Sequence, residues 1–139
     1  QTRRSSVLIS PNRSYVVKYV LASVLAGRAL RFYDGRVAAP TPAFDLAAAC
    51  LIAGERLLED KSLSGTYHYQ GAPHASLFEV ASVIVAQAGL ERQVVSDTSE
   101  PSNLRLDCTM TSAALGLRAP DWQRGLAFIL RDIRAVKPT

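Results

Sequence analysis

The segment Arg36–Ala47, with the sequence RVAAPTPAFDLA, decides the fold of this chain. Pro40 and Pro42 each hold φ at about −65° and favour an extended lead-in. Thr41 is a residue type that caps helices, and Pro42 suits the first turn of a helix. Asp45 then places a negative charge near the positive end of the helix dipole. The segment therefore predicts an extended strand that turns sharply into a helix.

The apolar run Leu46–Ile52 follows at once and predicts that a helix over residues 42–59 is buried in the domain. Cys50 lies inside this run, where a small buried thiol is the usual finding. Cys108, the other of the 2 cysteines, lies in a polar stretch. Because neither has a C-x-x-C neighbour, we expect two reduced thiols in a cytoplasmic protein.

The composition predicts a folded globular protein. The 139 residues suffice for one domain, with 48% hydrophobic and 20% charged residues. A net charge of +4 without a basic run or interleaved aromatic residues predicts no nucleic-acid partner. No apolar run approaches the roughly 18 residues that a membrane span needs, so we expect no membrane insertion. Because the first residue is Gln1 rather than Met, we expect an expression boundary or a truncated reading frame.

Hydrophobic periodicity predicts short strands alternating with helices. The predicted strands cover residues 7–9, 30–33, 66–70 and 93–95. The predicted helices cover residues 15–26, 42–59, 77–88, 109–115 and 122–133. Ser76–Glu79 has the spacing of a capping box, Gly89 suits a helix end, and Asp121 suits the start of the last helix. Ser10–Arg13 is predicted to form a turn and Ser96–Ser102 a polar loop. The order of short strands and helices predicts an α/β fold with a small sheet.

Signatures of self-contained catalysis are absent from the sequence. It holds no G-x-G-x-x-G, P-loop, H-E-x-x-H or G-x-S-x-G motif. None of the 5 tyrosines precedes a lysine by four residues, the spacing that short-chain reductases use. Tyr15 and Lys18 come closest and are expected to be neighbours on a helix surface. His68 and His74 lack the further ligands that a metal site needs, so we predict neither a metal site nor catalytic residues. Trp122 is expected to anchor the core.

Six segments along almost the whole chain recur, in the same order, in one enzyme family. They are RSSVLISP (residues 4–11), YV (15–16), the segment Arg36–Ala47, TYHYQG (66–71), PSNLRL (101–106) and PDWQ (120–123). In this order they resemble dTDP-4-dehydrorhamnose reductases of the extended short-chain dehydrogenase/reductase superfamily. The last two segments are the most specific after Arg36–Ala47, because they place rare residue types at the right separation.

The resemblance implies that residues 1–139 form the RmlD-like substrate-binding region of such a reductase. This region is the C-terminal portion of a Rossmann-type enzyme, a mostly helical lobe with a few short strands. A Rossmann half preceding it would hold NADPH or NADH and carry the catalytic tyrosine and lysine, so this region alone would be inactive. The implied reaction is hydride transfer to C4 of a dTDP-linked 4-keto-6-deoxy sugar, giving dTDP-L-rhamnose for cell-surface polysaccharide. The expected partner is that sugar, and formation of a homodimer stays open.

The resemblance also implies site residues. A diphosphate calls for guanidinium groups, which bind phosphate oxygens in a bidentate fork. Arg36 and Arg105 are the candidates for that role, with Asn103 as a polar partner. Val7 stands where the family has a tryptophan near the sugar. Ser5 and Ser6 are the implied cofactor contacts.

Several positions depart from the family pattern. Val7 and Ile9 replace a tryptophan and a tyrosine, Arg36 and Ala38 replace a glutamine and a glycine, and Glu100 replaces an arginine. These changes favour a second hypothesis, a non-catalytic interaction subunit similar to the regulatory subunit of methionine adenosyltransferase.

A third hypothesis is an unrelated α/β domain, which would bury all its apolar helices by itself. The reductase hypothesis instead predicts an exposed apolar face on residues 15–26 or on the first strand, where the other half would dock.

Overall fold

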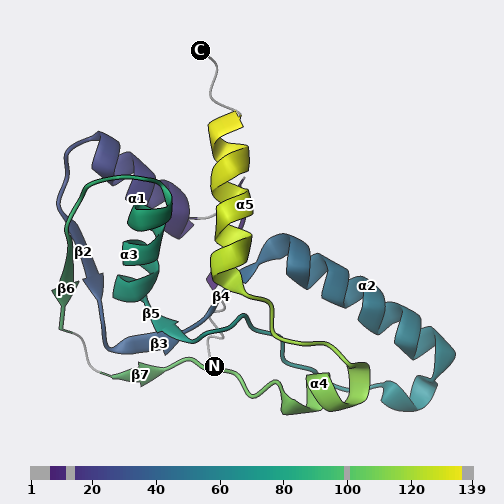
Figure 1. Ribbon diagram of the computed structural model, residues 1–139. Coiled ribbons are helices and arrows are strands. Elements are labelled where there is room, and N and C mark those ends of the chain that lie inside the picture. The colour runs from purple at the N-terminus through teal and green to yellow at the C-terminus, as the bar shows by residue number, and fades with distance from the viewer. Residues whose placement is uncertain (1–6, 12–14, 99–100, 136–139) are drawn as a thin grey trace.

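The computed structural model describes residues 7–11, 15–98 and 101–135, and the chain forms a mixed α/β domain (Figure 1). The elements in chain order are β1 (Val7–Ile9), α1 (Tyr15–Leu25), β2 (Leu30–Tyr33), β3 (Arg36–Ala38), β4 (Pro40–Pro42), α2 (Ala43–Glu59), the short 3-10 helix η1 (Lys61–Leu63), β5 (Ala75–Ser76), α3 (Leu77–Gln87), β6 (Val94–Asp97), β7 (Ser102–Asn103), α4 (Thr109–Leu115) and α5 (Trp122–Ala135). None of the helices in the described ranges is long and apolar enough to cross a membrane.

The strands form three small ladders rather than one large sheet. β1 pairs in parallel with β4, and β2 pairs in parallel with β6. β3 lies between β5, which is antiparallel to it, and β7, which is parallel to it. The expected α/β class and small sheet are therefore confirmed.

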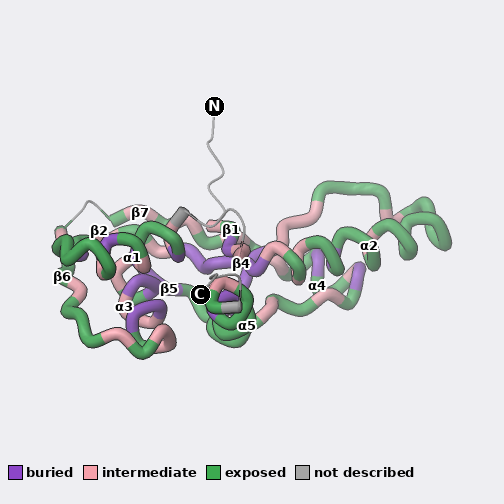
Figure 2. Tube along the Cα trace, turned by 90° about the horizontal axis from the view of Figure 1, so that it is seen from above, coloured by how far each residue is buried: buried purple, intermediate pink, exposed green. Residues whose placement is uncertain are grey.

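The core lies where α1, α3 and α5 meet the strands. α3 contacts α1, α5, β2 and β6, and its Ile84 belongs to the same buried core cluster as Leu126 of α5. Trp122, at the start of α5, is 1% exposed and donates its indole N–H to the Pro73 carbonyl oxygen at 2.8 Å. The expected core anchor is thus confirmed. In Figure 2 the buried residues gather in α3, α5 and β4, whereas α2 is mostly exposed.

The segment Arg36–Ala47 turns from strand to helix as predicted, but Thr41 does not cap the helix. α2 begins at Ala43, after Pro42, and has no side-chain cap. Thr41 lies in β4 opposite Leu8, and its hydroxyl oxygen accepts the backbone N–H of Gly71 at 3.1 Å. The prediction was wrong because a distant segment crosses β4 and occupies the hydroxyl.

The burial predicted for α2 is also wrong. Ala49 is its one buried residue, and Cys50 is an exposed free thiol. Leu51 and Leu58 are 72% and 84% exposed. Figure 1 shows the reason, since α2 projects away from α1, α3 and the β2–β6 ladder. In the described residues, α2 is packed chiefly at its start and on the side of α4 and η1.

The predicted helix ends are mostly confirmed. Ser76 Oγ accepts the Glu79 N–H at 3.1 Å, and Glu79 Oε2 accepts the Ser76 N–H at 2.6 Å, which completes the capping box before α3. Gly89 follows α3 with φ of 68°. Asp121 Oδ1 accepts the N–H groups of Gln123 and Arg124 at 3.0 and 3.3 Å and caps α5.

Two predicted segments differ from the structure. Residues 66–70 form no strand, because their anchors are side chains of distant residues rather than a neighbouring strand. Thr111, for example, donates its hydroxyl to the His68 carbonyl oxygen at 2.5 Å. The expected loop Ser96–Ser102 contributes to two strands, since β6 runs to Asp97 and β7 begins at Ser102. The predicted turn Ser10–Arg13 lies partly outside the described residues.

Candidate functional site

The pairing of β3 with β7 brings three of the predicted substrate residues to one small sheet. Arg36 opens β3 opposite Ser102, and Asn103 closes β7 opposite Val37. Backbone bonds continue the ladder at both ends, from the Ser102 N–H to Gly35 O and from the Leu104 N–H to Val37 O, each 2.8 Å long. Arg105 therefore leaves the ladder at a fixed point, two residues after Asn103.

Asn103 holds Arg105 directly. Its side-chain oxygen accepts both the backbone N–H of Arg105 at 3.1 Å and the guanidinium Nε–H at 2.9 Å. Both residues are exposed. One acceptor thus fixes both the turn of the chain and the near end of the guanidinium group. A guanidinium group held in this way is suited to two parallel hydrogen bonds with phosphate oxygens.

Arg36 lies beside this pair but on the other face of the ladder. Paired residues share a face and successive residues alternate, so Arg36 lies with Ser102, opposite to Val37 and Asn103. The Arg36 side chain is exposed and makes no hydrogen bond with the described residues. The structure therefore brings Asn103 and Arg105 together and leaves Arg36 as a separate neighbouring cation.

The other predicted residues are not part of this cluster. Val7 lies in β1 opposite Pro40, in a different ladder, and is half-buried. Ser5 and Ser6, the implied cofactor contacts, lie outside the described residues, as does Glu100.

Gln70 is a site residue that the sequence analysis missed. Its side chain is buried, with 2% exposed. Its Nε2 donates to Leu104 O at 3.2 Å, and its Oε1 accepts the Leu106 N–H at 3.0 Å. These two bonds hold the chain on either side of Arg105. Gln70 lies within the segment TYHYQG (66–71), which carries part of the resemblance. A single glutamine in a sequence does not indicate which distant groups it will bind.

A cavity of about 680 Å³ opens beside Gln70 and Leu106, lined by both apolar and polar side chains. Its lining includes Gln70, His74, Cys108, Ser112 and Arg118. Burial raises the pKa of the Cys108 thiol, the opposite of what an activated nucleophile needs. The described residues contain no group of three His, Cys, Asp or Glu side chains that could hold a metal ion. The cavity thus offers binding groups rather than a catalytic constellation.

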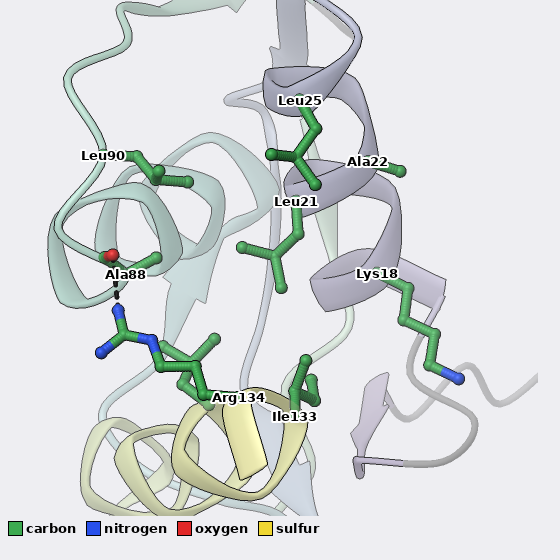
Figure 3. A pocket seen from close by; sticks show the side chains of 9 residues that line it. Lys18, Leu21, Ala22, Leu25, Ala88, Leu90, Ile133 and Arg134 are labelled. Carbon is green, nitrogen blue, oxygen red and sulfur yellow. Dashed lines mark hydrogen bonds between the residues drawn. The ribbon is translucent and has the colours of Figure 1, made fainter. Parts of the chain in front are cut away.

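Figure 3 shows a second cavity of about 370 Å³, between α1, α3 and α5. Leu21, Leu25 and Leu90 point into the space between these helices. Arg134 donates to the Ala88 carbonyl oxygen at 2.5 Å, so its charge is engaged at the rim. The lining is mostly hydrocarbon, with Lys18 and Arg134 as its charged residues.

The described residues do not form a dinucleotide-binding site. Such a binding site needs a glycine-rich turn between a strand and the start of a helix. The three glycines with positive φ are Gly27, Gly89 and Gly116, and each follows the end of a helix instead. This part of the chain therefore does not fit a nicotinamide cofactor by itself.

Comparison with known proteins identifies the family. Residues 2–135 match the family model of the RmlD substrate binding domain. A dTDP-4-dehydrorhamnose reductase from Aggregatibacter actinomycetemcomitans is 29% identical over 115 residues, which are 72% of this chain and 38% of that protein. The methionine adenosyltransferase 2 subunit beta of Xenopus laevis is 30% identical over 90 residues, 58% of this chain and 27% of that protein.

Solved structures show the same fold. A dTDP-4-dehydrorhamnose reductase from Bacillus anthracis, in complex with NADP, superposes with a TM-score of 0.77 at 22% identity, over 91% of this chain and 45% of that one. The reductase from Clostridium acetobutylicum gives 0.79 at 20% identity, over 93% and 47%.

The fold is therefore shared with part of these two solved structures. The chain belongs to the RmlD substrate binding domain family and spans less than half the length of these relatives.

Proposed function

We propose that this chain is the substrate-binding half of an NAD(P)H-dependent nucleotide-sugar reductase of the cytoplasm. The proposed substrate is a dTDP-linked 4-keto-6-deoxy sugar, which is reduced at C4 as in dTDP-L-rhamnose synthesis for cell-surface polysaccharide. The nicotinamide cofactor would supply the hydride and would be held by a further part of the protein. The match over residues 2–135 to the RmlD substrate binding domain supports this proposal.

The observation that carries the proposal is the Asn103–Arg105 pair, together with the two hydrogen bonds by which Gln70 holds the chain around Arg105. These two bonds are called the Gln70 brace below. Asn103 Oδ1 holds the guanidinium at Nε, 2.9 Å away, and Gln70 holds the backbone on both sides. A diphosphate gains most from a cation that is already oriented, because less side-chain entropy is lost on binding. In this proposal Arg105 binds the diphosphate, Asn103 and Gln70 position Arg105, and Arg36 adds a neighbouring charge. Val7 would lie nearer the sugar.

Calorimetry with dTDP on the full-length gene product tests this role. Wild type is expected to bind in the micromolar range. Arg105→Ala should weaken binding about ten- to hundredfold, as expected for a charged hydrogen-bonding group. Arg28→Ala removes an exposed arginine just beyond α1 and serves as the control, with unchanged affinity. Equal affinity of the two variants would refute the assignment of Arg105.

A second candidate function is a non-catalytic interaction subunit. The similarity to methionine adenosyltransferase 2 subunit beta, 30% over 90 residues, favours it. Val7 and Ile9, where the reductase pattern has aromatic residues, point the same way. A folded full-length protein that binds neither dTDP nor dTDP-sugars would support this candidate, whereas micromolar binding would contradict a purely structural role.

A further inference from the structure

The cavity between α1, α3 and α5 is a second binding site, separate from the Asn103–Arg105 pair. Its volume of about 370 Å³ lies within the range of small-molecule pockets, roughly 300–1,000 Å³. Its lining shares no residue with β3, with β7 or with the Gln70 brace. We propose that it binds a single-chain carboxylate, which is a linear hydrocarbon chain of medium length that ends in one carboxylate group.

One wall of the cavity is a continuous stripe of α1. Lys18, Leu21, Ala22 and Leu25 have the i, i+3, i+4, i+7 spacing that lies on one face of a helix. The rise of a helix places Leu25 about 10 Å along the axis from Lys18. The stripe therefore runs from a cation to an apolar end. Leu25 is 70% exposed, which confirms the exposed apolar side chains expected on residues 15–26.

The rest of the lining has the same polarity. Ile133 and Arg134 of α5 line the cavity, and Leu90 closes it beyond the end of α3. In Figure 3, Lys18 and Arg134 lie on either side of Ile133 near α5, whereas Leu25 and Leu90 lie at the other end. No acidic side chain of the described residues lines this cavity. Its two ends thus match the two ends of a single-chain carboxylate.

The apolar part of the cavity suits a hydrocarbon chain better than it suits water. A buried water molecule needs about two to four polar partners, which Leu21, Leu25 and Leu90 do not provide. Ala22 and Ala88 contribute only methyl groups to the lining, so space remains between the larger side chains. A chain in this space gains binding free energy with each methylene group that it removes from water.

Arg134 is the group that would bind the carboxylate. It donates to the Ala88 carbonyl oxygen at 2.5 Å, which holds it at the rim. A guanidinium group has five N–H donors, so this bond leaves others for a carboxylate. Arg134 also lines an adjoining hollow of about 300 Å³, together with Arg131, whereas Asp132 lines neither space. With Lys18, these arginines make the α5 end of the cavity positive.

A small amphiphile fits this cavity better than a peptide segment does. The walls are mostly helix, and the backbone groups of a helix bond to one another. The amide groups of a bound peptide would therefore meet few partners among the described residues, which is costly for buried polar groups. A hydrocarbon chain has no such groups, and its carboxylate would lie at the positive end.

Calorimetric titration of the full-length gene product with decanoate, below the concentration at which micelles form, tests the proposal. Wild type is expected to bind one decanoate per chain. Affinity should rise about three- to fourfold with each added methylene group from octanoate to dodecanoate. dTDP is expected not to compete, because the Asn103–Arg105 pair lies outside the cavity.

Three variants at exposed positions locate the ligand. Arg134→Gln should weaken decanoate binding about tenfold or more and leave the affinity for the neutral 1-decanol unchanged. Leu25→Glu puts a charge at the apolar end and should weaken binding of both ligands. Arg31→Gln is the matched control, because Arg31 lies on the face of β2 opposite to the buried Leu30. It should change neither affinity.

Several outcomes would overturn the proposal. One is the absence of saturable decanoate binding, and another is competition by dTDP, which would put the ligand in the proposed nucleotide-sugar site. Equal losses of decanoate and 1-decanol affinity in Arg134→Gln would show that the charge of Arg134 does not bind the carboxylate. A decanoate affinity that neither Arg134→Gln nor Leu25→Glu lowers would put the ligand elsewhere on the protein.

Discussion

Gly71 donates its backbone N–H to the hydroxyl oxygen of Thr41 at 3.1 Å, which joins two segments 30 residues apart. A Cβ atom added at Gly71 would lie 2.0 Å from the carbonyl oxygen of Pro40. The backbones approach this closely only because position 71 has no side chain. The turn from β4 into α2 is therefore set by a distant glycine as well as by its own prolines.

Gly71→Ala should destabilise the protein by about 2 kcal/mol or more, because the clash is with rigid backbone and overpacking typically costs roughly 1–3 kcal/mol. Urea unfolding followed by circular dichroism measures the change. Gly54→Ala is the control, since open space surrounds that position and alanine favours a helix by up to about 1 kcal/mol. Similar midpoints for Gly71→Ala and wild type would contradict the close approach.

Thr41→Val should destabilise the protein by about 1–3 kcal/mol, because it leaves the buried Gly71 N–H without an acceptor. Thr41→Ser keeps the hydroxyl and is expected to restore most of the loss. The comparison separates the hydrogen bond from the packing of the methyl group. If the serine variant were as unstable as the valine variant, the bond would not be the cause.

Gln70→Leu should loosen the chain around Arg105, because both of its bonds to residues 104 and 106 are lost. Amide hydrogen exchange at Leu106 is expected to speed up, and affinity for dTDP is expected to fall about tenfold. Gln70→Glu keeps the acceptor for the Leu106 N–H and should retain its protection. Faster exchange without a loss of dTDP affinity would show that the brace does not position a ligand group.

Asp45 should make stability fall as pH rises. Burial raises the pKa of its carboxyl, and the charge of Arg124 offsets part of that effect. A carboxyl whose folded pKa exceeds its unfolded pKa binds its proton more tightly in the folded state, so stability drops from about pH 3.9 upward until the folded pKa is passed.

Titration of Asp45 by carbon NMR should therefore give a pKa above the usual aspartate range, and Arg124→Ala should raise that pKa further. Asp45→Asn should flatten the fall in stability over the same pH window. A measured pKa at or below the ordinary value would contradict the burial effect.

Local signals in the sequence predicted local structure well. The capping box of Ser76 and Glu79, the helix end at Gly89 and the cap at Asp121 depend on neighbours within a few residues, and each is confirmed. Asn103 and Arg105 were selected through a resemblance, and the structure joins them because Arg105 follows two residues after Asn103, the last residue of β7.

The predictions that depended on residues far away in the sequence were the ones that disagreed with the structure. Thr41 has the chemistry of a cap, but Gly71 occupies its hydroxyl. Residues 66–70 have strand-forming side chains, yet their anchors come from segments 34 to 43 residues away. The apolar run around Cys50 predicts burial, which the described residues do not provide. An apolar sequence indicates that a helix packs against a partner, but it does not identify that partner.

The most direct test of the central claim is consumption of NADPH by the full-length gene product with a dTDP-linked 4-keto-6-deoxy sugar. We predict sugar-dependent, saturable oxidation of NADPH that dTDP inhibits competitively, and that Arg105→Ala weakens through a higher KM. A folded full-length protein that neither oxidises NADPH nor binds dTDP would contradict the account.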